Sequence, residues 1–171
     1  MSLPDIKNLF DVSGKVALIT GATGGFGHAA ALGLAAAGVK IMATGRSDET
    51  LQALVKEIEE AGGNAAHCSG SPIVYDDVRR VVHETVETFG GIDILITAAG
   101  VNKPGPITEQ PLEEWEMIMD ANVKGTYLFC KEAGRVMIEQ GRGGKVILLG
   151  SARGELGMAN YTAYSTSKGA M

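Results

Sequence analysis

The stretch Thr20-Gly21-Ala22-Thr23-Gly24-Gly25-Phe26-Gly27 decides the fold, because it joins a short apolar run to a segment of small residues. The apolar run, KVALIT at residues 15–20, predicts a buried strand, and residues 25–37 predict a helix that ends at Gly38. Glycines let the backbone approach a pyrophosphate closely, and the start of a helix offers unpaired N–H groups and a positive dipole end. The alternative is a plain tight turn before a tightly packed helix. Strand, spacing and helix together favour a dinucleotide site, built from Gly21, Thr23, Gly24, Gly25, Phe26 and Gly27.

Apolar runs alternate with amphipathic segments along the rest of the chain. Further strands are predicted at residues 39–44, 64–68, 92–97 and 145–149. Helices are predicted at residues 48–61, 76–89 and 112–140, with the start of another at 161–171. The segment 112–140 is one long helix or two, with a bend near residues 122–125, and its Lys131 and Glu132 are expected on a solvated face. The alternation predicts an α/β fold with a doubly wound parallel sheet, in a single domain over residues 1–171.

The composition excludes several classes of function. The 171 residues include 15 Lys and Arg against 20 Asp and Glu, a formal net charge of −5. Nucleic acids and anionic membranes need clustered positive charge, so neither is an expected partner. Cys68 and Cys130 are too far apart for a disulfide scaffold or a zinc site, and no metal is expected. No apolar run reaches the roughly 18 residues that span a bilayer, and residues 1–10 lack the apolar stretch of a signal peptide, so we expect a cytoplasmic protein.

Four polar residues form a candidate catalytic set. Tyr164 and Lys168 are four residues apart, so on a helix they share one face. Lowering the pKa of a free tyrosine by about three units takes roughly 4 kcal/mol, and an ammonium about 4 Å away supplies about that much at an effective dielectric near 20. Ser151 follows the last predicted strand, where sites form in doubly wound sheets, unless it is only a turn serine. Asn122 is a poor residue for a helix interior, and marks either a functional position or an ordinary bend.

These motifs occur in the order and spacing of a known family. The loop reads Thr-Gly-x-x-x-Gly-x-Gly, and Ser151 precedes the Tyr-x-x-x-Lys pair by 13 residues. The sequence thus resembles the short-chain dehydrogenase/reductase family over essentially the whole chain, including its 3-oxoacyl carrier-protein reductases and its gluconate or polyol dehydrogenases. The resemblance implies a Rossmann-like fold and hydride transfer between a nicotinamide and a carbonyl or secondary alcohol. It also implies the roles of the candidate set: Tyr164 as general acid and base, Lys168 as its partner and ribose ligand, Ser151 orienting the substrate oxygen, and Asn122 holding a helix bend and a water.

The residues after the second predicted strand bear on which dinucleotide binds. An NAD site usually has an acid at this strand end, whereas here no acid stands there and Arg46 follows at once. A guanidinium matches a 2′-phosphate, so NADP(H) is favoured over NAD(H), unless Arg46 is only a solvated residue at a helix start. After the fourth predicted strand, Ala99 and Gly100 let the backbone approach the cofactor ribose.

Two features leave the activity of the chain itself open. Thr97 replaces a structural amide of the family, a change that we expect a strand end to tolerate, and Ser69 or Ser71 stands where an Asp near the adenine is common. The chain also stops at Met171, whereas members of the family are longer, so we expect a C-terminally incomplete domain. It is either a carbonyl reductase or alcohol dehydrogenase, acting on a small molecule as a homodimer or homotetramer if complete, or a non-catalytic remnant that binds a dinucleotide.

Overall fold

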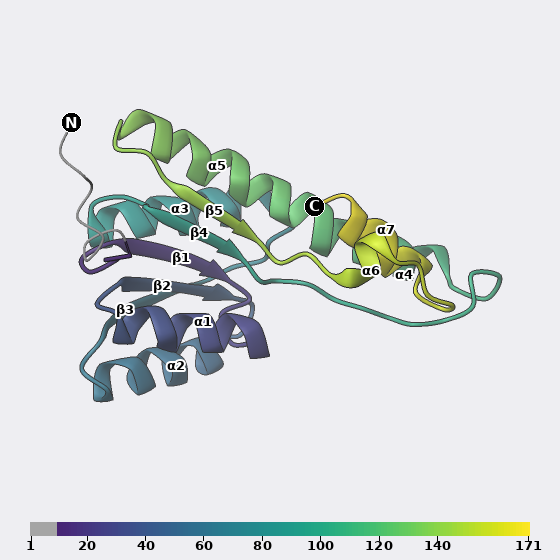
Figure 1. The fold of residues 1–171 in the computed structure, drawn as a ribbon, viewed down its shortest axis with the longest axis horizontal. Coiled ribbons are helices and arrows are strands. Elements are labelled where there is room, and N and C mark those ends of the chain that lie inside the picture. Colours follow the sequence, from purple (N-terminus) through teal and green to yellow (C-terminus); the bar gives the residue numbers. More distant parts are fainter. Residues whose placement is uncertain (1–9) are drawn as a thin grey trace.

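Five parallel strands form one sheet in the computed structural model, which describes residues 10–171 (Figure 1). The strands are β1 (Val16–Thr20), β2 (Lys40–Gly45), β3 (Asn64–Ser69), β4 (Ile94–Thr97) and β5 (Lys145–Leu148). Their order across the sheet is β3-β2-β1-β4-β5, so the chain builds outward from β1 to one edge and then returns to build the other. The predicted α/β class with a doubly wound parallel sheet is therefore confirmed.

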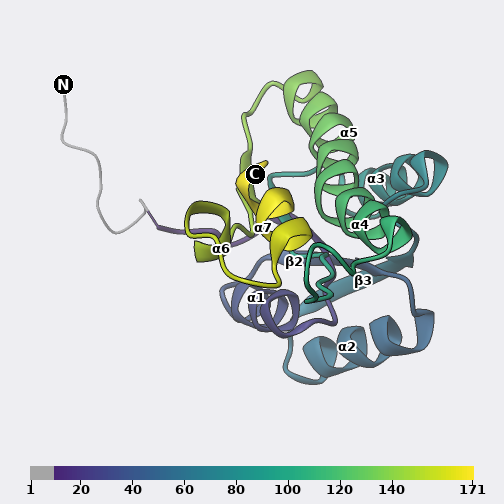
Figure 2. The same cartoon turned by 90° about the vertical axis from the view of Figure 1, so that its right-hand side faces the viewer.

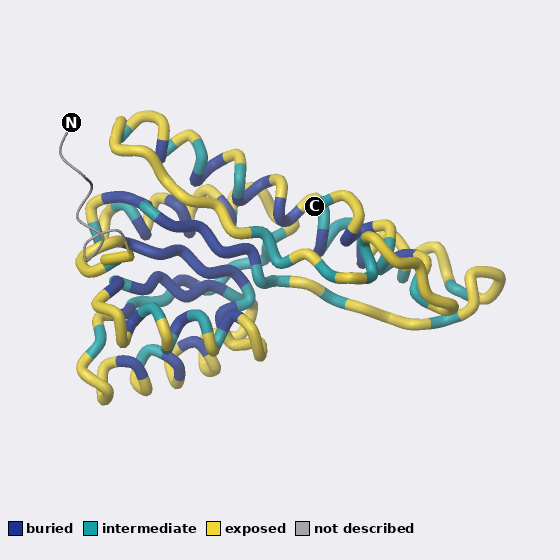
Figure 3. Tube along the Cα trace, viewed as in Figure 1, coloured by how far each residue is buried: buried dark blue, intermediate teal, exposed yellow. Residues whose placement is uncertain are grey.

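Helices cover both faces of this sheet. On one face lie α1 (Gly25–Ala36) and α2 (Asp48–Glu60), and on the other lie α3 (Tyr75–Phe89) and α5 (Gly125–Glu139), as Figure 1 shows. Because both faces are covered, the central strands are apolar along most of their length, and every residue of β1 is buried. Figure 3 shows the buried strands between helices whose outer faces are exposed. The apolar runs of β1, β2 and β4 thus correspond to strands enclosed on two sides, whereas the edge strand β5 is largely exposed.

The remaining helices lie beyond the carboxyl ends of the strands (Figure 1). They are α4 (Leu112–Met119), α6 (Ala152–Glu155) and α7 (Thr162–Gly169), and α7 lies between the other two in Figure 2. A π-helical segment, η2 (Asp120–Lys124), joins α4 directly to α5. The segment predicted as one helix or two is therefore two helices with a π turn between them. The short helix α6 was not predicted.

The carboxyl ends of the central strands carry a row of threonines. The parallel register places Thr20 of β1 opposite both Thr44 of β2 and Thr97 of β4. All three are buried, and Thr20 Oγ1 accepts a hydrogen bond from the N–H of Ala99 at 3.2 Å. The hydroxyls of Thr44 and Thr97 find no hydrogen-bond partner among residues 10–171. An unpaired buried hydroxyl generally costs about 1–3 kcal/mol, so Thr97 is a position where a substitution can measure that cost.

One side chain expected on a solvated face is buried. Glu132 of α5 is only 3% exposed, whereas Lys131 beside it is exposed. The hydroxyl of Tyr75 donates to Glu132 Oε1 at 2.6 Å, and Arg135 Nη2 lies 3.2 Å from Glu132 Oε2. The prediction was wrong for Glu132 because α3 packs against α5 and brings Tyr75 over the carboxylate.

The sequence predicted neither a membrane-spanning segment nor a signal peptide. Within residues 10–171, no helix is both long enough and apolar enough to cross a bilayer. Residues 1–9, which make up nearly all of the segment in which no signal peptide was predicted, lie outside the described residues.

Candidate active site

The glycine loop lies between β1 and α1 and touches the segment that follows β4. Gly21 has a φ of +60°, and a Cβ atom there would lie 2.7 Å from the Cα of Ala99. A Cβ atom at Gly27 would collide with the carbonyl oxygen of Gly21, so α1 can pack on the loop only without a side chain here. Gly24 is the N-cap of α1 and has no side chain to bond the first amides. Those amides are left for a ligand, which is the arrangement that phosphate binding requires.

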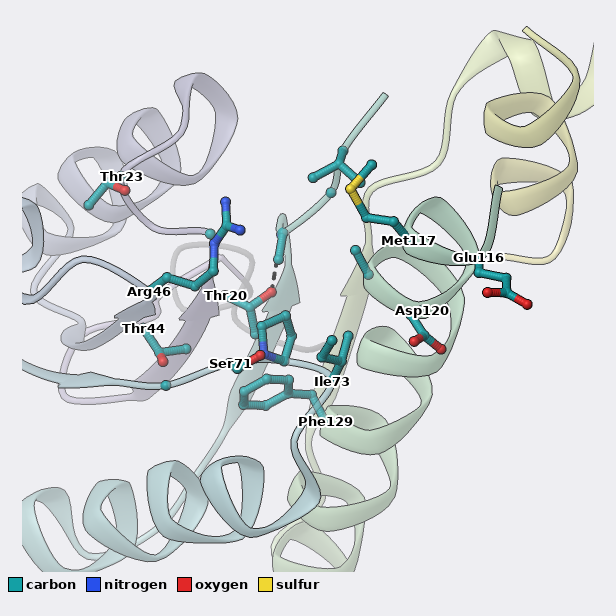
Figure 4. Close-up of a pocket in the computed structure, with 18 of the residues that line it drawn as sticks. Thr20, Thr23, Thr44, Arg46, Ser71, Ile73, Glu116, Met117, Asp120 and Phe129 are labelled. Atoms are coloured by element: carbon teal, nitrogen blue, oxygen red, sulfur yellow. Dashed lines mark hydrogen bonds between the residues drawn. The ribbon is translucent and has the colours of Figure 1, made fainter. Parts of the chain in front are cut away.

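A cavity of about 490 Å³ opens beside this loop at the carboxyl ends of the strands (Figure 4). Five residues of the predicted dinucleotide site line it: Gly21, Thr23, Arg46, Ala99 and Gly100. The predicted Gly24, Gly25 and Gly27 do not line it, and they lie at the N-cap and in the first turn of α1.

The opposite wall of this large cavity was missed in the sequence. It comes from the loop after β3 and from α4 and α5, through Pro72, Ile73, Met117 and Phe129 among others. Glu113, Glu116, Met117 and Asp120 also line it, and their spacing of three and four residues shows that they share one helix face. This spacing can be read from the sequence, but it does not show that the helix face lines a cavity.

Arg46 directly follows β2 and lines the cavity on the side opposite Met117 and Asp120, as Figure 4 shows. The helix that follows is capped by Ser47, whose Oγ accepts from the N–H of Thr50 at 3.4 Å. The next acid in the chain, Asp48, lies 3.2 Å from His67 Nε2. Arg46 is therefore exposed beside the cavity with its guanidinium available to an anion.

A second cavity, of about 390 Å³, contains Tyr164 and Lys168 together with Phe26 and Leu149. Gly100 and Val101 line both cavities, so the two adjoin at the segment after β4. The structure thus brings the Tyr–Lys pair of α7 next to the glycine loop, although about 140 residues separate them in the chain.

Lys168 is the buried cation of this second cavity. Its side chain is largely enclosed, and Nζ donates to the carbonyl oxygen of Leu149 at 2.5 Å. The same Nζ lies 5.9 Å from the centre of the Tyr164 ring. Burial lowers the pKa of the Lys168 ammonium, because the low-dielectric surroundings disfavour its charged form. The Tyr164 ring also packs edge-on against Tyr161, with ring centres 6.3 Å apart.

Asn122 is fully buried in η2 and joins three parts of the site. Its Oδ1 accepts from the N–H of Val101 at 2.8 Å, and its Nδ2 donates to the Val101 carbonyl at 3.0 Å. Nδ2 also donates to Ser167 Oγ at 2.9 Å, one residue before Lys168. Asn122 therefore links the junction of the two cavities to the helix that bears Tyr164 and Lys168.

The hydroxyl of Ser151 is engaged in a local cap. This residue is the N-cap of α6, and its Oγ accepts from the N–H of Arg153 at 3.2 Å. It does not line the cavity that holds Tyr164 and Lys168. The local sequence explains this, because a serine before a short helix caps its first turn.

The residues present fit a dinucleotide. Gly21 and Gly27 leave room for close backbone approach, and the unpaired buried hydroxyl of Thr44 lines the large cavity, where a ligand could satisfy it. Within residues 10–171, no group of three or more His, Cys, Asp and Glu side chains is arranged to hold a metal ion.

Comparisons with known proteins agree with this geometry. The family model described as short chain dehydrogenase matches residues 15–171. An uncharacterized oxidoreductase of Mycobacterium tuberculosis is 42% identical over 161 residues, covering 93% of this chain and 58% of that protein. A 3-oxoacyl-[acyl-carrier-protein] reductase of Synechocystis is 32% identical, covering 92% and 64%. A 2-dehydro-3-deoxy-D-gluconate 5-dehydrogenase of Formosa agariphila is 34% identical, covering 96% and 62%.

A solved structure gives the same result. The crystal structure of a short-chain type dehydrogenase/reductase from Mycobacterium marinum superposes with a TM-score of 0.93 at 37% identity, covering 97% of this chain and 68% of that one. The chain spans about 58% to 64% of the length of the curated relatives that it matches.

Proposed function

The chain belongs to the short-chain dehydrogenase family, and on that premise we propose that it binds a nicotinamide dinucleotide and interconverts a carbonyl and a secondary alcohol. The bound cofactor would supply the hydride donor or acceptor, which is chemistry that no side chain provides. The protein would supply binding, orientation and the proton.

The observation that carries this proposal is the buried Lys168 ammonium beside Tyr164, in a cavity that adjoins the glycine loop. The Lys168 Nζ lies 5.9 Å from the centre of the Tyr164 ring and donates a hydrogen bond to the Leu149 carbonyl. A phenol can donate a proton during reduction, and the phenolate left behind can accept one during oxidation.

The other residues of the set act around that proton. Tyr164 gives its hydroxyl proton to the substrate oxygen as the carbonyl is reduced, and takes it back as the alcohol is oxidised. Ser151 would orient that oxygen if its hydroxyl, now a cap of α6, turns toward Tyr164. Asn122 holds the backbone of Val101 and the helix of Lys168 in register, and in this role is a support for the proton-transfer pair.

We assign the cofactor as NADP(H), held by the glycine loop at the pyrophosphate, by Arg46 at the 2′-phosphate and by Lys168 at the nicotinamide ribose. The exposed guanidinium beside the large cavity supports this assignment, since a planar guanidinium binds phosphate through two parallel hydrogen bonds. We propose a small-molecule substrate, since the relatives include both a sugar-acid dehydrogenase and an acyl-carrier reductase. We also propose that the whole protein is a homodimer or homotetramer.

Tyr164→Phe tests the proposed role of the phenol. Because general acid–base catalysis contributes about 10²- to 10⁴-fold, we expect kcat to fall by at least about a hundredfold, while the Kd for NADPH stays within about twofold. Tyr161→Phe is the matched control, since Tyr161 contacts the same ring but holds no proton in the reaction. A Tyr164→Phe variant that keeps more than about a tenth of the turnover would contradict the assignment.

A second function, dinucleotide binding without turnover, is favoured by the Ser151 hydroxyl, which serves as the cap of α6. The two functions differ in one measurement. Binding of NADPH with no turnover of any of a panel of ketones, keto acids and polyols supports the binding-only function, and turnover that requires Tyr164 excludes it.

A further inference from the structure

The loop between β3 and α3 forms one wall of the large cavity. Gly70, Ser71, Pro72 and Ile73 line it, and Figure 4 shows Ser71 and Ile73 on this wall. Arg46 and Thr23 line the same cavity, whereas Tyr164 and Lys168 line the other one. The loop therefore lines the cavity that does not contain the Tyr–Lys pair.

Two charged residues of α3 hold this loop from behind. Asp77 Oδ2 accepts a hydrogen bond from the N–H of Ser71 at 2.9 Å. Arg80 Nη2 donates to Asp77 Oδ1 at 3.0 Å and to the carbonyl of Ser69 at 2.7 Å, and its Nη1 donates to Cys68 Sγ at 2.9 Å. Asp77 and Arg80 thus grip the backbone on both sides of Gly70 without lining the cavity themselves.

The loop held by Asp77 and Arg80 is also hydrogen-bonded next to Arg46, which we assign to the 2′-phosphate. The N–H of Gly70 donates to the carbonyl of Gly45 at 2.8 Å, and Gly45 directly precedes Arg46. A displacement of the loop would therefore disturb both the wall beside Pro72 and the strand end that carries the guanidinium. The hydrogen bond from Ser71 and the neighbouring Arg80 also hold the pKa of the Asp77 carboxyl below its usual range, so the grip is charged at neutral pH.

We propose that Asp77 and Arg80 are positioning residues for the adenosine half of the dinucleotide. They fix the β3–α3 loop as the wall against which the base and its ribose bind, and they touch no part of the ligand. The apolar surfaces of Pro72 and Ile73 suit the faces of a planar base, and the Ser71 hydroxyl suits its polar edge. This inference rests on the proposed function, because it takes the large cavity to be the adenosine end of a dinucleotide site.

The test compares neighbouring residues of the same helix. Asp77→Ala is matched with Asp76→Ala, and Arg80→Gln with Arg79→Gln, because Asp76 and Arg79 are exposed and the hydrogen bonds to the loop come from Asp77 and Arg80. The probes are adenosine 2′,5′-bisphosphate and ADP, whose binding is measured by calorimetry without any turnover. We expect Asp77→Ala and Arg80→Gln to weaken both probes about tenfold, as loss of a hydrogen bond to a charged group allows, and the controls to stay within about twofold.

Three further readouts separate positioning from general destabilisation. The KM for NADPH should rise about tenfold while kcat changes by less than about twofold, because the Tyr–Lys cavity is not touched. Amide hydrogen exchange of residues 69–73 should accelerate in both variants, with the central strands unchanged. Asp77→Asn, which keeps an oxygen acceptor for the Ser71 N–H, should recover part of the lost affinity and reports on the site if the alanine variant does not fold.

The outcomes distinguish the two levels of proposal. If the unmodified protein binds neither probe nor NADPH, the proposed function fails and the positioning role fails with it. If the unmodified protein binds the probes and Asp77→Ala and Arg80→Gln bind them equally well, only the positioning role is overturned. Equal weakening by the Asp76 and Arg79 controls would also overturn it, because the effect would then belong to the helix and not to the loop contacts.

Discussion

Replacing Asn122 by alanine should lower the free energy of unfolding by more than the loss of one hydrogen bond would, because its side-chain amide makes three. The side chain has no exposed surface and makes three hydrogen bonds, two with the backbone of Val101 and one with Ser167 Oγ. The variant would leave the N–H and the carbonyl of Val101 without these partners. At about 1 kcal/mol net for each hydrogen bond, we expect a loss of about 3 kcal/mol in the free energy of unfolding.

Urea denaturation measures this loss directly. With an m-value of about 2 kcal/mol/M, a loss of about 3 kcal/mol lowers the midpoint by about 1.5 M at unchanged slope. A double-mutant cycle then isolates the bond to α7. Ser167→Ala removes the acceptor of the Asn122 amide, so the two substitutions should couple by about 1 kcal/mol. Tyr75→Phe, which loses only the hydrogen bond to Glu132, is the distant partner that should add to Asn122→Ala within about 0.5 kcal/mol.

Two results would refute the reasoning about Asn122. A loss below about 1 kcal/mol would mean that the three hydrogen bonds are replaced by water at no net cost. Strict additivity with Ser167→Ala would mean that η2 and α7 are not held together by this bond, and the support that we assign to Asn122 for the Tyr164–Lys168 helix would fall.

Three further predictions concern single positions. The hydrogen bond from Tyr75, and then Arg135, hold the pKa of Glu132 below its usual value of 4.5, so this stabilisation is present above about pH 4.5 and is lost as pH falls through the lower folded-state pKa. Glu132→Gln should therefore reduce the loss of stability at acid pH, measured as urea midpoints from about pH 7 down to 3. An unchanged loss would exclude the contacts of Glu132 as its source. Thr97→Val replaces a buried hydroxyl that is unpaired within residues 10–171, so the free energy of unfolding should stay level or rise by up to about 1 kcal/mol, and a clear loss in the same urea assay would show that the hydroxyl has a partner. Arg46→Ala should raise the KM for NADPH about tenfold and leave that for NADH within about twofold, whereas equal effects on both cofactors would contradict a 2′-phosphate role.

The fold was predictable because its signals are local and repeated. Every strand of the sheet begins and ends within two residues of its predicted range. The central strands β1, β2 and β4 are buried and mostly apolar, as strands enclosed on both faces must be. The glycine loop was predictable for the same reason, because strand, loop and helix start are continuous in the chain. The order of Asn122, Ser151, Tyr164 and Lys168 in the sequence indicated a catalytic site, but it did not predict the distances between their side chains.

The remainder depended on contacts between segments far apart in the chain. Glu132 was expected in solvent because it follows a lysine on a helix, yet its partner Tyr75 lies 57 residues away on α3. The cap made by Ser151 depends on α6, which has four residues and is too short for any hydrophobic period to reveal. The grip of Asp77 on the β3–α3 loop was hidden for another reason, since an acid in the first turn of a helix is common for dipole reasons alone.

The π-helical segment η2 lies between the walls of the two cavities. Just after it, the first residue of α5 is Gly125, where an added Cβ would lie 3.0 Å from the Cβ of Pro72 on the wall of the large cavity. Within it, Asn122 binds both backbone groups of Val101, which lines both cavities. Packing on one side and hydrogen bonding on the other therefore fix a single turn of helix between the proposed adenosine wall and the Tyr–Lys helix. A π turn has poorer hydrogen-bond geometry than an α-helix and often marks a functional position. Here it allows one continuous helical segment to contact Pro72 on one side and Val101 and Ser167 on the other.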